Sequence, residues 1–290
     1  VNTQILHNNI NNNNNNSNNN DDDDDDDNKK KSETTTVTAK TTSAPSNSST
    51  NTSTTSTSDP LSPVLSLLDS ILTKTKTSPH LIPYQLFFPS PSTTTDVHGP
   101  LRPYYLIRQS LPLSLPSRLQ KRPPLDHGHK RYLTYQLLLL LPLLRSADLV
   151  HLDISPVTVR VTSYLYVLLA DFGCHKPLLL DRNDPTAYNH YFKRQDTDGC
   201  CVSPSRFVSS SFPAPSPSVA SGSWSAEAGA ADAFSVGCVV ASVWLNGEPL
   251  FNLPGLLRFK DGKRDEVNAT IKKVPDKAVR AVVRRMVEGG

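Results

Sequence analysis

The stretch from His151 to Gly173, HLDISPVTVRVTSYLYVLLADFG, carries the most informative pattern in this sequence. Two short runs rich in β-branched and aromatic residues, Val157 to Thr162 and Tyr166 to Ala170, are separated by three residues. Such spacing predicts a β-hairpin. One aspartate, Asp153, stands shortly before the hairpin, and another, Asp171, stands directly after it.

The two aspartates lie in short motifs that resemble those of protein kinases. His151-Leu152-Asp153 resembles the catalytic-loop H-R-D, and Asp171-Phe172-Gly173 matches the metal-binding D-F-G. Kinases place these motifs at the two ends of such a hairpin, so that the aspartates converge on the substrate hydroxyl and on the ATP metal. The separation of 18 positions (171 − 153) is similar to that of ordinary kinases. A lone D-F-G often arises by chance, whereas the paired motifs are a specific signal.

Two later strings follow in the order that kinases show. Cys201 to Phe207, CVSPSRF, stands where kinases end the activation segment with A-P-E, and Asp232 to Gly237, DAFSVG, resembles the D-x-x-x-x-G of the large buried helix in the C-lobe. In kinases that aspartate accepts hydrogen bonds from the catalytic-loop backbone, which explains an acid in an apolar helix. A helix N-cap is the alternative role for Asp232.

Seven strings between residues 105 and 251 narrow the resemblance further. They are YLIRQSL (105–111), VTS (161–163), VLLADF (167–172), NDP (183–185), SRF (205–207), FSVGCVV (234–240) and GEPLF (247–251). Together they resemble the vacuolar-protein-sorting serine/threonine-protein kinases, the regulatory subunits of class III phosphatidylinositol 3-kinase. The resemblance covers about Asp59 to Val287. In that family, helical repeats and a β-propeller follow the kinase domain.

The resemblance implies a fold and a role. It implies an α+β protein-kinase-like fold, with a partial N-lobe at about residues 59–112 and a helical C-lobe at about 113–290. It implies ATP and Mg²⁺ as cofactors, and partnership with the lipid kinase subunit and with associated autophagy and sorting subunits. The expected location is cytoplasmic, peripheral on endosomal, vacuolar or autophagic membranes.

The same resemblance assigns the candidate site residues. Asp153 is the expected catalytic base, and Asp171 is the expected metal ligand that holds ATP through Mg²⁺. Thr158 occupies the position of the asparagine that holds a second magnesium, where a hydroxyl is a poorer ligand than an amide carbonyl. His151 is expected to be structural, packed under the catalytic loop.

Several positions depart from the kinase pattern. Ser155 stands where a lysine usually neutralises charge on the transferred phosphoryl group, and Leu152 replaces the arginine of H-R-D. Ser205 replaces the glutamate of A-P-E, so we expect the anchor of that segment to be lost. No G-x-G-x-x-G and no lysine strand precede Ser62. Because such clamps supply much of the rate of phosphoryl transfer, the sequence predicts weak or absent activity.

Residues 1–58 differ in composition from the remainder. They contain the asparagine run Asn11 to Asn16, the aspartate run Asp21 to Asp27 and a Ser/Thr-rich tract, so they have little apolar surface to bury. We expect a disordered tail.

The net charge of +3 is scattered, which argues against nucleic-acid binding. The cysteine spacing favours reduced thiols over metal binding. No signal peptide is visible, and the apolar run Leu137 to Leu144 is too short to cross a bilayer.

Hydrophobic periodicity and turn residues predict the remaining elements. These are a helix of about three turns from Ser62, a strand pair at Leu81 to Phe88 and Tyr104 to Leu111, a helix from Lys130 to Arg145 that Pro142 kinks or ends, a loop from Cys174 to Ser223, and helices at Ala231 to Leu245 and Lys277 to Val287.

Three functions remain open from the sequence. The first is a kinase-like platform of the lipid-kinase regulatory subunit, acting in endosomal or vacuolar sorting and autophagy with impaired phosphotransfer. The second is an active serine/threonine protein kinase whose ATP-gripping N-lobe strands are missing from this sequence. The third is a degenerate copy without stable function, which the proline in the Leu137 to Leu144 run and the missing motifs favour.

Overall fold

The computed structural model divides the chain into two compact units, Val1–Ser62 with Tyr84–Ser110 and Pro63–Pro83 with Leu111–Gly290. The structure describes residues 2–7, 36–38, 62–75, 78–82, 84–89, 94–96, 99–101, 104–111, 113–173, 176–193, 199–209 and 224–289.

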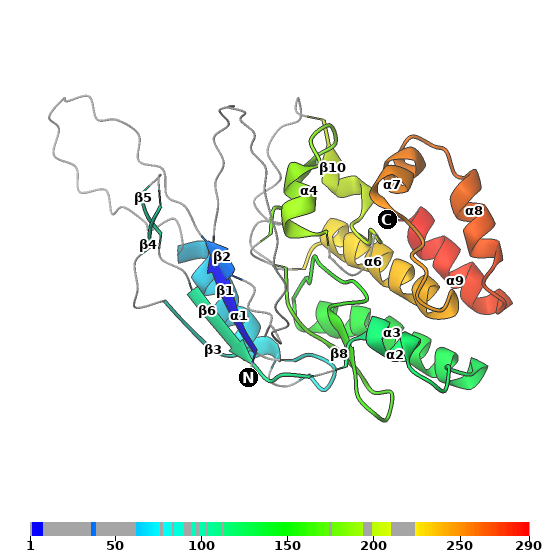
Figure 1. Ribbon diagram of the computed structural model, residues 1–290, viewed down its shortest axis with the longest axis horizontal. Coiled ribbons are helices and arrows are strands. Elements are labelled where there is room, and N and C mark those ends of the chain that lie inside the picture. Colours follow the sequence, from blue (N-terminus) through cyan, green and yellow to red (C-terminus); the bar gives the residue numbers. More distant parts are fainter. Residues whose placement is uncertain are drawn as a thin grey trace, which may run out of the picture. The chain divides into compact units, whose positions relative to one another are not determined.

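The smaller unit contains the strands drawn in blue and teal in Figure 1. They are β1 (Asn2–His7), β2 (Thr36–Thr38), β3 (Tyr84–Pro89), β4 (Thr94–Asp96), β5 (Gly99–Leu101) and β6 (Tyr104–Arg108). Four of them form a sheet in the order β2-β1-β6-β3, and β4 pairs with β5. β3 and β6 are antiparallel, which confirms the predicted strand pair.

β1 and β2 lie within residues 1–58, for which composition predicts a disordered tail. β1 pairs antiparallel with β6, with Asn2 opposite Arg108, and parallel with β2. These ladders use backbone groups, so a strand can form without the apolar side chains that the composition argument requires. Both homopolymer runs, Asn11 to Asn16 and Asp21 to Asp27, lie outside the described residues.

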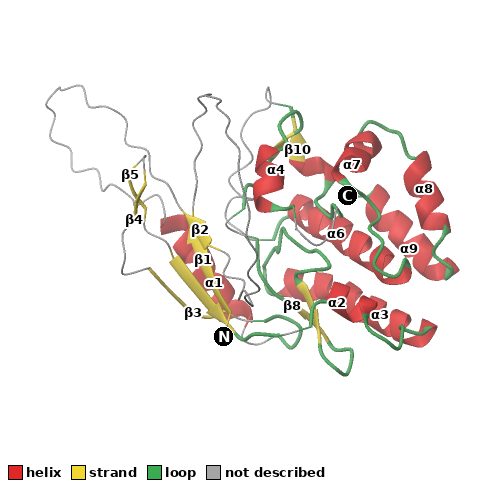
Figure 2. Ribbon diagram, in the orientation of Figure 1, coloured by secondary structure: helices red, strands yellow, loops and turns green. Residues whose placement is uncertain are grey.

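The larger unit is mainly helical, as the red ribbons of Figure 2 show. Its elements are α1 (Ser62–Thr75), α2 (Leu115–Gln120), α3 (His127–Ser146), β7 (Val159–Val161), β8 (Val167–Leu169), β9 (Leu180–Asp181), α4 (Thr186–Tyr191), η1 (Pro204–Arg206), β10 (Phe207–Val208), α6 (Ala226–Trp244), α7 (Leu253–Lys260), α8 (Asp265–Lys272) and α9 (Lys277–Glu288). Residues 63–83 belong to this unit, whereas the family resemblance predicted them to be part of a partial N-lobe.

α6 forms the centre of the larger unit, with α3 and α9 packed against it (Figure 1). Ser225 caps its first turn by accepting a hydrogen bond from the Ala228 N–H. A Cβ at Gly237 would lie 3.0 Å from the Cβ of Met286, so glycine allows α9 to pack closely. Of the residues the structure describes, only α6 forms a helix long and apolar enough to cross a membrane, and most of it is buried. Such burial is typical of a core helix.

α3 does not end at Pro142, so of the two outcomes predicted there the early end is wrong. The helix begins after Asp126, whose carboxylate accepts a hydrogen bond from the His129 N–H at 2.7 Å, and it continues to Ser146. Pro142 is exposed. Its ring removes one backbone hydrogen bond, and water can satisfy the carbonyl left without a donor on that side. The helix therefore continues for one further turn.

Other helices differ from the sequence prediction in extent. α9 confirms the predicted C-terminal helix, and α6 begins five residues before the predicted start (231 − 226). α2 and α7 were missed, although Ser114 and Asn252 cap them and a proline lies in the first turn of each. α8 was also missed. The segment predicted to be a loop includes α4, η1 and two short strands that pair with each other.

The β7–β8 hairpin confirms the predicted antiparallel pair and is tied to the helices by Gln136 of α3. The Gln136 amide group donates to the Leu165 carbonyl at 2.8 Å, and its oxygen accepts from the Val167 N–H at 2.9 Å. On the other side of β8, Leu169 exchanges backbone hydrogen bonds with His80 and Ile82. Hydrogen bonds on both sides of β8 therefore fix the hairpin. The hairpin in turn positions Asp153 before it and Asp171 after it.

We predict that Gln136→Leu lowers the free energy of unfolding by about 1–3 kcal/mol, because the Leu165 carbonyl and the Val167 N–H would be buried without a partner. Tyr135→Leu is the matched control, since Tyr135 is the adjacent residue on α3 and is 61% exposed. We expect that control to stay within about 0.5 kcal/mol of the parent chain. Urea denaturation followed by circular dichroism measures both, and equal losses would contradict this role of Gln136.

Candidate active site

Asp232 of α6 binds the backbone of the catalytic loop. Its two carboxylate oxygens accept hydrogen bonds from the backbone N–H of His151, at 2.7 Å, and of Leu152, at 2.8 Å. This confirms the expected contact, and the N-cap alternative is wrong because Ser225 caps α6 seven residues earlier (232 − 225). Burial raises the pKa of Asp232, and the two backbone hydrogen bonds oppose that rise. The bonds also hold Leu152 at φ 62°, a backbone region that non-glycine residues rarely adopt.

His151 joins the two motifs. Its Nε2 lies 2.9 Å from the Ala170 carbonyl, and its Nδ1 accepts from the Asp153 N–H at 3.3 Å. A carbonyl can only accept, so Nε2 carries the proton and the ring is neutral. Burial lowers the pKa of His151, which agrees with the neutral ring. The imidazole also packs against Phe172, with ring centres 4.6 Å apart.

Gly173 brings the D-F-G segment into direct contact with the catalytic loop. Its N–H donates to the His151 carbonyl at 2.9 Å. A Cβ at this position would lie 2.8 Å from the Cβ of Asp153, so no larger residue fits without movement of the loop. The two motifs that the sequence pairs by spacing are therefore packed against each other.

Asp153, the candidate catalytic base, forms an ion pair that the sequence analysis did not predict. The Lys176 Nζ lies 2.6 Å from Asp153 Oδ2, and the two side chains are 8% and 6% exposed. Lys176 stands three residues after the D-F-G glycine, outside any motif considered from the sequence. Its spacing in the chain gives no signal that it meets Asp153.

Thr158, the second candidate for cofactor binding, makes its contacts within the catalytic loop. Its Oγ1 donates to the Asp153 carbonyl and accepts from the Ser155 N–H, each at 2.9 Å. The residue is buried. Thr158 therefore stabilises the loop backbone, and a role toward a metal stays a prediction.

Asp171, the candidate metal ligand, lies beside a cation. The Arg160 Nη2 is 3.7 Å from Asp171 Oδ2, and the side chains are 17% and 15% exposed. The described residues contain no group of three or more histidines, cysteines or acids that could hold a metal ion. Mg²⁺ is commonly bound by one or two carboxylates together with substrate phosphates. Asp171 thus fits a magnesium ion that arrives with a nucleotide.

Arg206 anchors the segment in which the A-P-E glutamate is missing, so this segment is held by a residue other than the one at the glutamate position. The buried guanidinium donates to three backbone carbonyls, at 2.6–2.8 Å. One belongs to Leu152 in the catalytic loop, and the others belong to Pro177 and Leu178 after the D-F-G. A charged donor with planar, divergent N–H groups can hold both segments at once.

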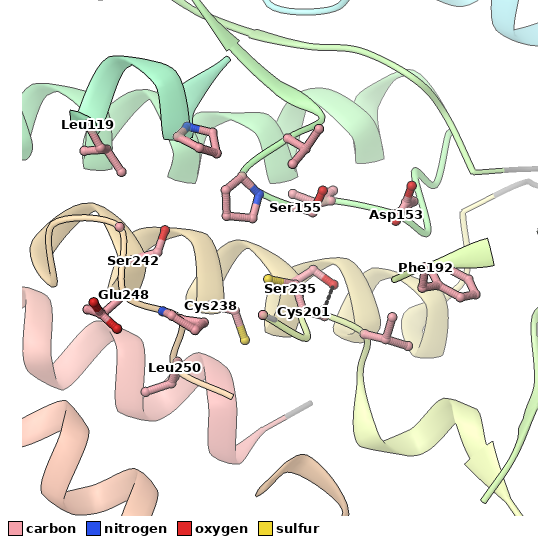
Figure 3. A pocket seen from close by; sticks show the side chains of 18 of the residues that line it. Leu119, Asp153, Ser155, Phe192, Cys201, Ser235, Cys238, Ser242, Glu248 and Leu250 are labelled. Atoms are coloured by element: carbon pink, nitrogen blue, oxygen red, sulfur yellow. Dashed lines mark hydrogen bonds between the residues drawn. The ribbon is translucent and has the colours of Figure 1, made fainter. Parts of the chain in front are cut away.

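A cavity of ≈ 410 Å³ lies beside the catalytic loop. In Figure 3, Asp153 and Ser155 lie on the loop at one wall, and Ser235, Cys238 and Ser242 lie on α6 at the facing wall. Among the described residues that line it, the charged side chains are both acids, Asp153 and Glu248.

Two of the described cysteines, Cys200 and Cys238, are buried. Burial raises the pKa of the Cys200 thiol to about 12 and raises that of Cys238 as well. Thiols of this kind stay protonated near neutral pH and are poor nucleophiles.

Comparison with known proteins agrees with the geometry. The chain is 31% identical over 218 residues to serine/threonine-protein kinase VPS15 of Arabidopsis thaliana, and 30% identical over 209 residues to the probable serine/threonine-protein kinase vps15 of Dictyostelium discoideum. Each match covers 72% of this chain. VPS15 of Saccharomyces cerevisiae is 33% identical over 162 residues, or 56% of this chain. The chain spans only 10% to 13% of the length of these curated relatives.

The comparison of structures supports the same fold. The crystal structure of Rad53 1–466 in complex with AMP-PNP matches with a TM-score of 0.53 and 14% identity, over 79% of this chain and 50% of that one. At this identity the match shows the fold alone, and it confirms the predicted α+β kinase-like class. No family model matches the chain. The fold, the packed motif pair and the curated relatives together identify the chain as a VPS15-like serine/threonine-protein-kinase-domain protein.

Proposed function

We propose that this chain is the kinase-like domain of a class III phosphatidylinositol 3-kinase regulatory subunit, acting in endosomal or vacuolar sorting and in autophagy. We further propose that it binds Mg²⁺ with ATP and transfers phosphate only weakly. The observation that carries the proposal is the contact between the Asp153 loop and the Asp171 segment through Gly173. The similarity to the VPS15 proteins supports it.

In this proposal each aspartate has a separate task. The Asp153 carboxylate accepts the proton of the substrate hydroxyl, as a general base must lie within hydrogen-bond reach of that proton. Asp171 holds Mg²⁺, which neutralises charge on the phosphates when bound. His151, Asp232 and Arg206 fix the loop backbone and do not touch the reacting atoms.

The impairment follows from the groups that surround these aspartates. Ser155 brings no charge to the transferred phosphoryl group, and Thr158 uses its hydroxyl within the loop. Arg160 stands beside Asp171, so a metal ion must compete with a guanidinium for that carboxylate. Each effect weakens either the binding of the metal ion or the electrostatic stabilisation of the transition state.

For nucleotide binding, we predict that Asp171→Asn and addition of chelator each lower ATP affinity at least about tenfold, because Asp171 holds the metal that joins ATP to the protein. Asp153→Asn is the matched control and should leave affinity within about twofold, since a general base acts on the acceptor hydroxyl. Isothermal titration calorimetry with a non-hydrolysable ATP analogue measures all three. Equal binding without metal, or unchanged affinity of Asp171→Asn, would show that the D-F-G does not bind nucleotide.

Arg160 provides a second test of the same site. We predict that Arg160→Gln lowers the Mg²⁺ concentration needed for half-maximal nucleotide binding several-fold, because the competing cation is removed from Asp171. Arg284→Gln is the control, since Arg284 is an exposed residue of α9. A rise in the required Mg²⁺ concentration would instead assign Arg160 to phosphate binding.

For catalysis, we predict slow phosphorylation of a generic basic protein, which Asp153→Ala lowers by at least about 100-fold, as expected for loss of a general base. The assay follows incorporation of labelled γ-phosphate at saturating ATP and Mg²⁺. Rates typical of kinases, about 1–100 per second, would favour the alternative of a fully competent kinase. Transfer that is unaffected by Asp153→Ala would contradict the assigned base.

The proposed cellular role needs a separate measurement. We predict that the chain co-purifies with the class III lipid kinase subunit, at an endosomal, vacuolar or autophagic membrane from which high salt releases it. The partner and the location both come from the family resemblance. Absence of the lipid kinase subunit from the purified material, with the chain folded and soluble, would contradict this part of the proposal.

A further inference from the structure

We propose that Lys176 is a positioning residue for Asp153 and supplies the positive charge that the buried Asp153 carboxylate needs. This inference rests on the proposed function, since it concerns the site at which phosphate would be transferred. It assigns a role to a lysine that belongs to none of the motifs recognised in the sequence.

The first observation is the environment of the Asp153 carboxylate. Its side chain is only 6% exposed, and a buried carboxylate is costly unless a cation or hydrogen-bond donors compensate its charge. Ser155, two residues later, offers a hydroxyl and no charge. Lys176 Nζ lies 2.6 Å from Asp153 Oδ2 and therefore supplies the positive charge.

The second observation is that Lys176 is held in place by several partners. Its Nζ also donates to the Tyr191 carbonyl at 2.8 Å and lies 5.1 Å from the centre of the Phe192 ring. With its side chain 8% exposed, the ammonium group has few other directions available. Because these contacts already order the Lys176 side chain, pairing with Asp153 costs it little further side-chain entropy. A lysine on the surface would lose more entropy on forming such a pair.

The third observation is that the backbone after Lys176 is tied to the catalytic loop. Arg206 binds the carbonyls of Pro177 and Leu178, and with the same guanidinium it binds the carbonyl of Leu152. The residues next to Lys176 and next to Asp153 thus share one anchor. The ion pair is built into the fold and does not depend on the Lys176 side chain alone.

These contacts have a chemical consequence for the proposed reaction. A general base accepts a proton only while it is ionised, and burial alone favours the neutral carboxyl group. An ammonium group 2.6 Å away favours the ionised form and restricts the orientation of the carboxylate. Lys176 therefore acts through Asp153, and it makes no contact with nucleotide in this proposal.

The catalytic test compares variants of the full chain. We expect Lys176→Met to lower kcat by ~100-fold, similar to the loss of a general base, while the affinity for a non-hydrolysable ATP analogue stays within about twofold. Adding Ser155→Lys to Lys176→Met should restore at least about a tenth of the parent rate, because it returns a cation two residues along the chain from Asp153. Lys193→Met is the matched control, since Lys193 is exposed in the same segment.

A second measurement does not require phosphotransfer. Thermal denaturation should show that Lys176→Met lowers Tm in the parent chain and has a much smaller effect in the Asp153→Asn background, where the buried carboxylate that pairs with Lys176 is absent. Ser155→Lys should again recover part of the loss. If the parent chain transfers no phosphate, the catalytic part of the proposed function fails, and this thermal cycle decides the inference alone.

The outcomes separate the two proposals. Coupling between Lys176 and Asp153 together with rescue by Ser155→Lys supports the inference, whether or not the parent chain is active. Equal losses of Tm in both backgrounds without rescue would overturn it. In an active chain, a kcat loss that Ser155→Lys does not recover, with the fold intact, would overturn it as well.

Discussion

The hydrogen bonds between Asp232 and the catalytic-loop backbone are the constraint on which the site depends. A carboxylate in the centre of an apolar helix is stable only if donors satisfy it, and here the donors are the N–H groups of His151 and Leu152. In turn, the carboxylate holds Leu152 in its left-handed conformation. From there the chain continues directly into Asp153, so the position of the candidate base is set from the core of the larger unit.

Around this centre, two basic side chains from later segments of the chain bind the catalytic loop. Lys176 provides a cation next to Asp153 where Ser155 provides none, and Arg206 anchors a segment in which Ser205 replaces an acid. Both side chains are largely buried, and both reach the loop across more than 20 residues of sequence (176 − 153 and 206 − 152). Electrostatic compensation of a buried group depends on distance in space, so a cation distant along the chain can supply it.

Local pattern accounts for the parts of the fold that were predicted correctly. β7 and β8 were predicted from β-rich runs and turn residues, and α9 was predicted from helical spacing. These signals are local, and the tertiary structure keeps the local conformation that they favour. Other features come from longer-range terms. β1 forms because β6 offers an edge, and α3 passes Pro142 because packing of its buried face outweighs one lost hydrogen bond. The short helix α4 lies among turn-forming residues. With only six residues, it is too short to show a helical period in its apolar positions.

The sequence by itself determined the kinase-like class, the pairing of the H-x-D and D-F-G motifs and the identity of Asp153, Asp171 and Thr158 as candidates. It also predicted the contact of Asp232 with the catalytic loop, because the D-x-x-x-x-G motif resembles the one whose aspartate binds the catalytic-loop backbone in kinases. Only the tertiary structure decided the partners of these residues: Lys176 for Asp153, Arg160 for Asp171 and the loop backbone for Thr158. An ion pair leaves no period or spacing in the sequence, since it needs only two charges brought within a few ångströms by the fold.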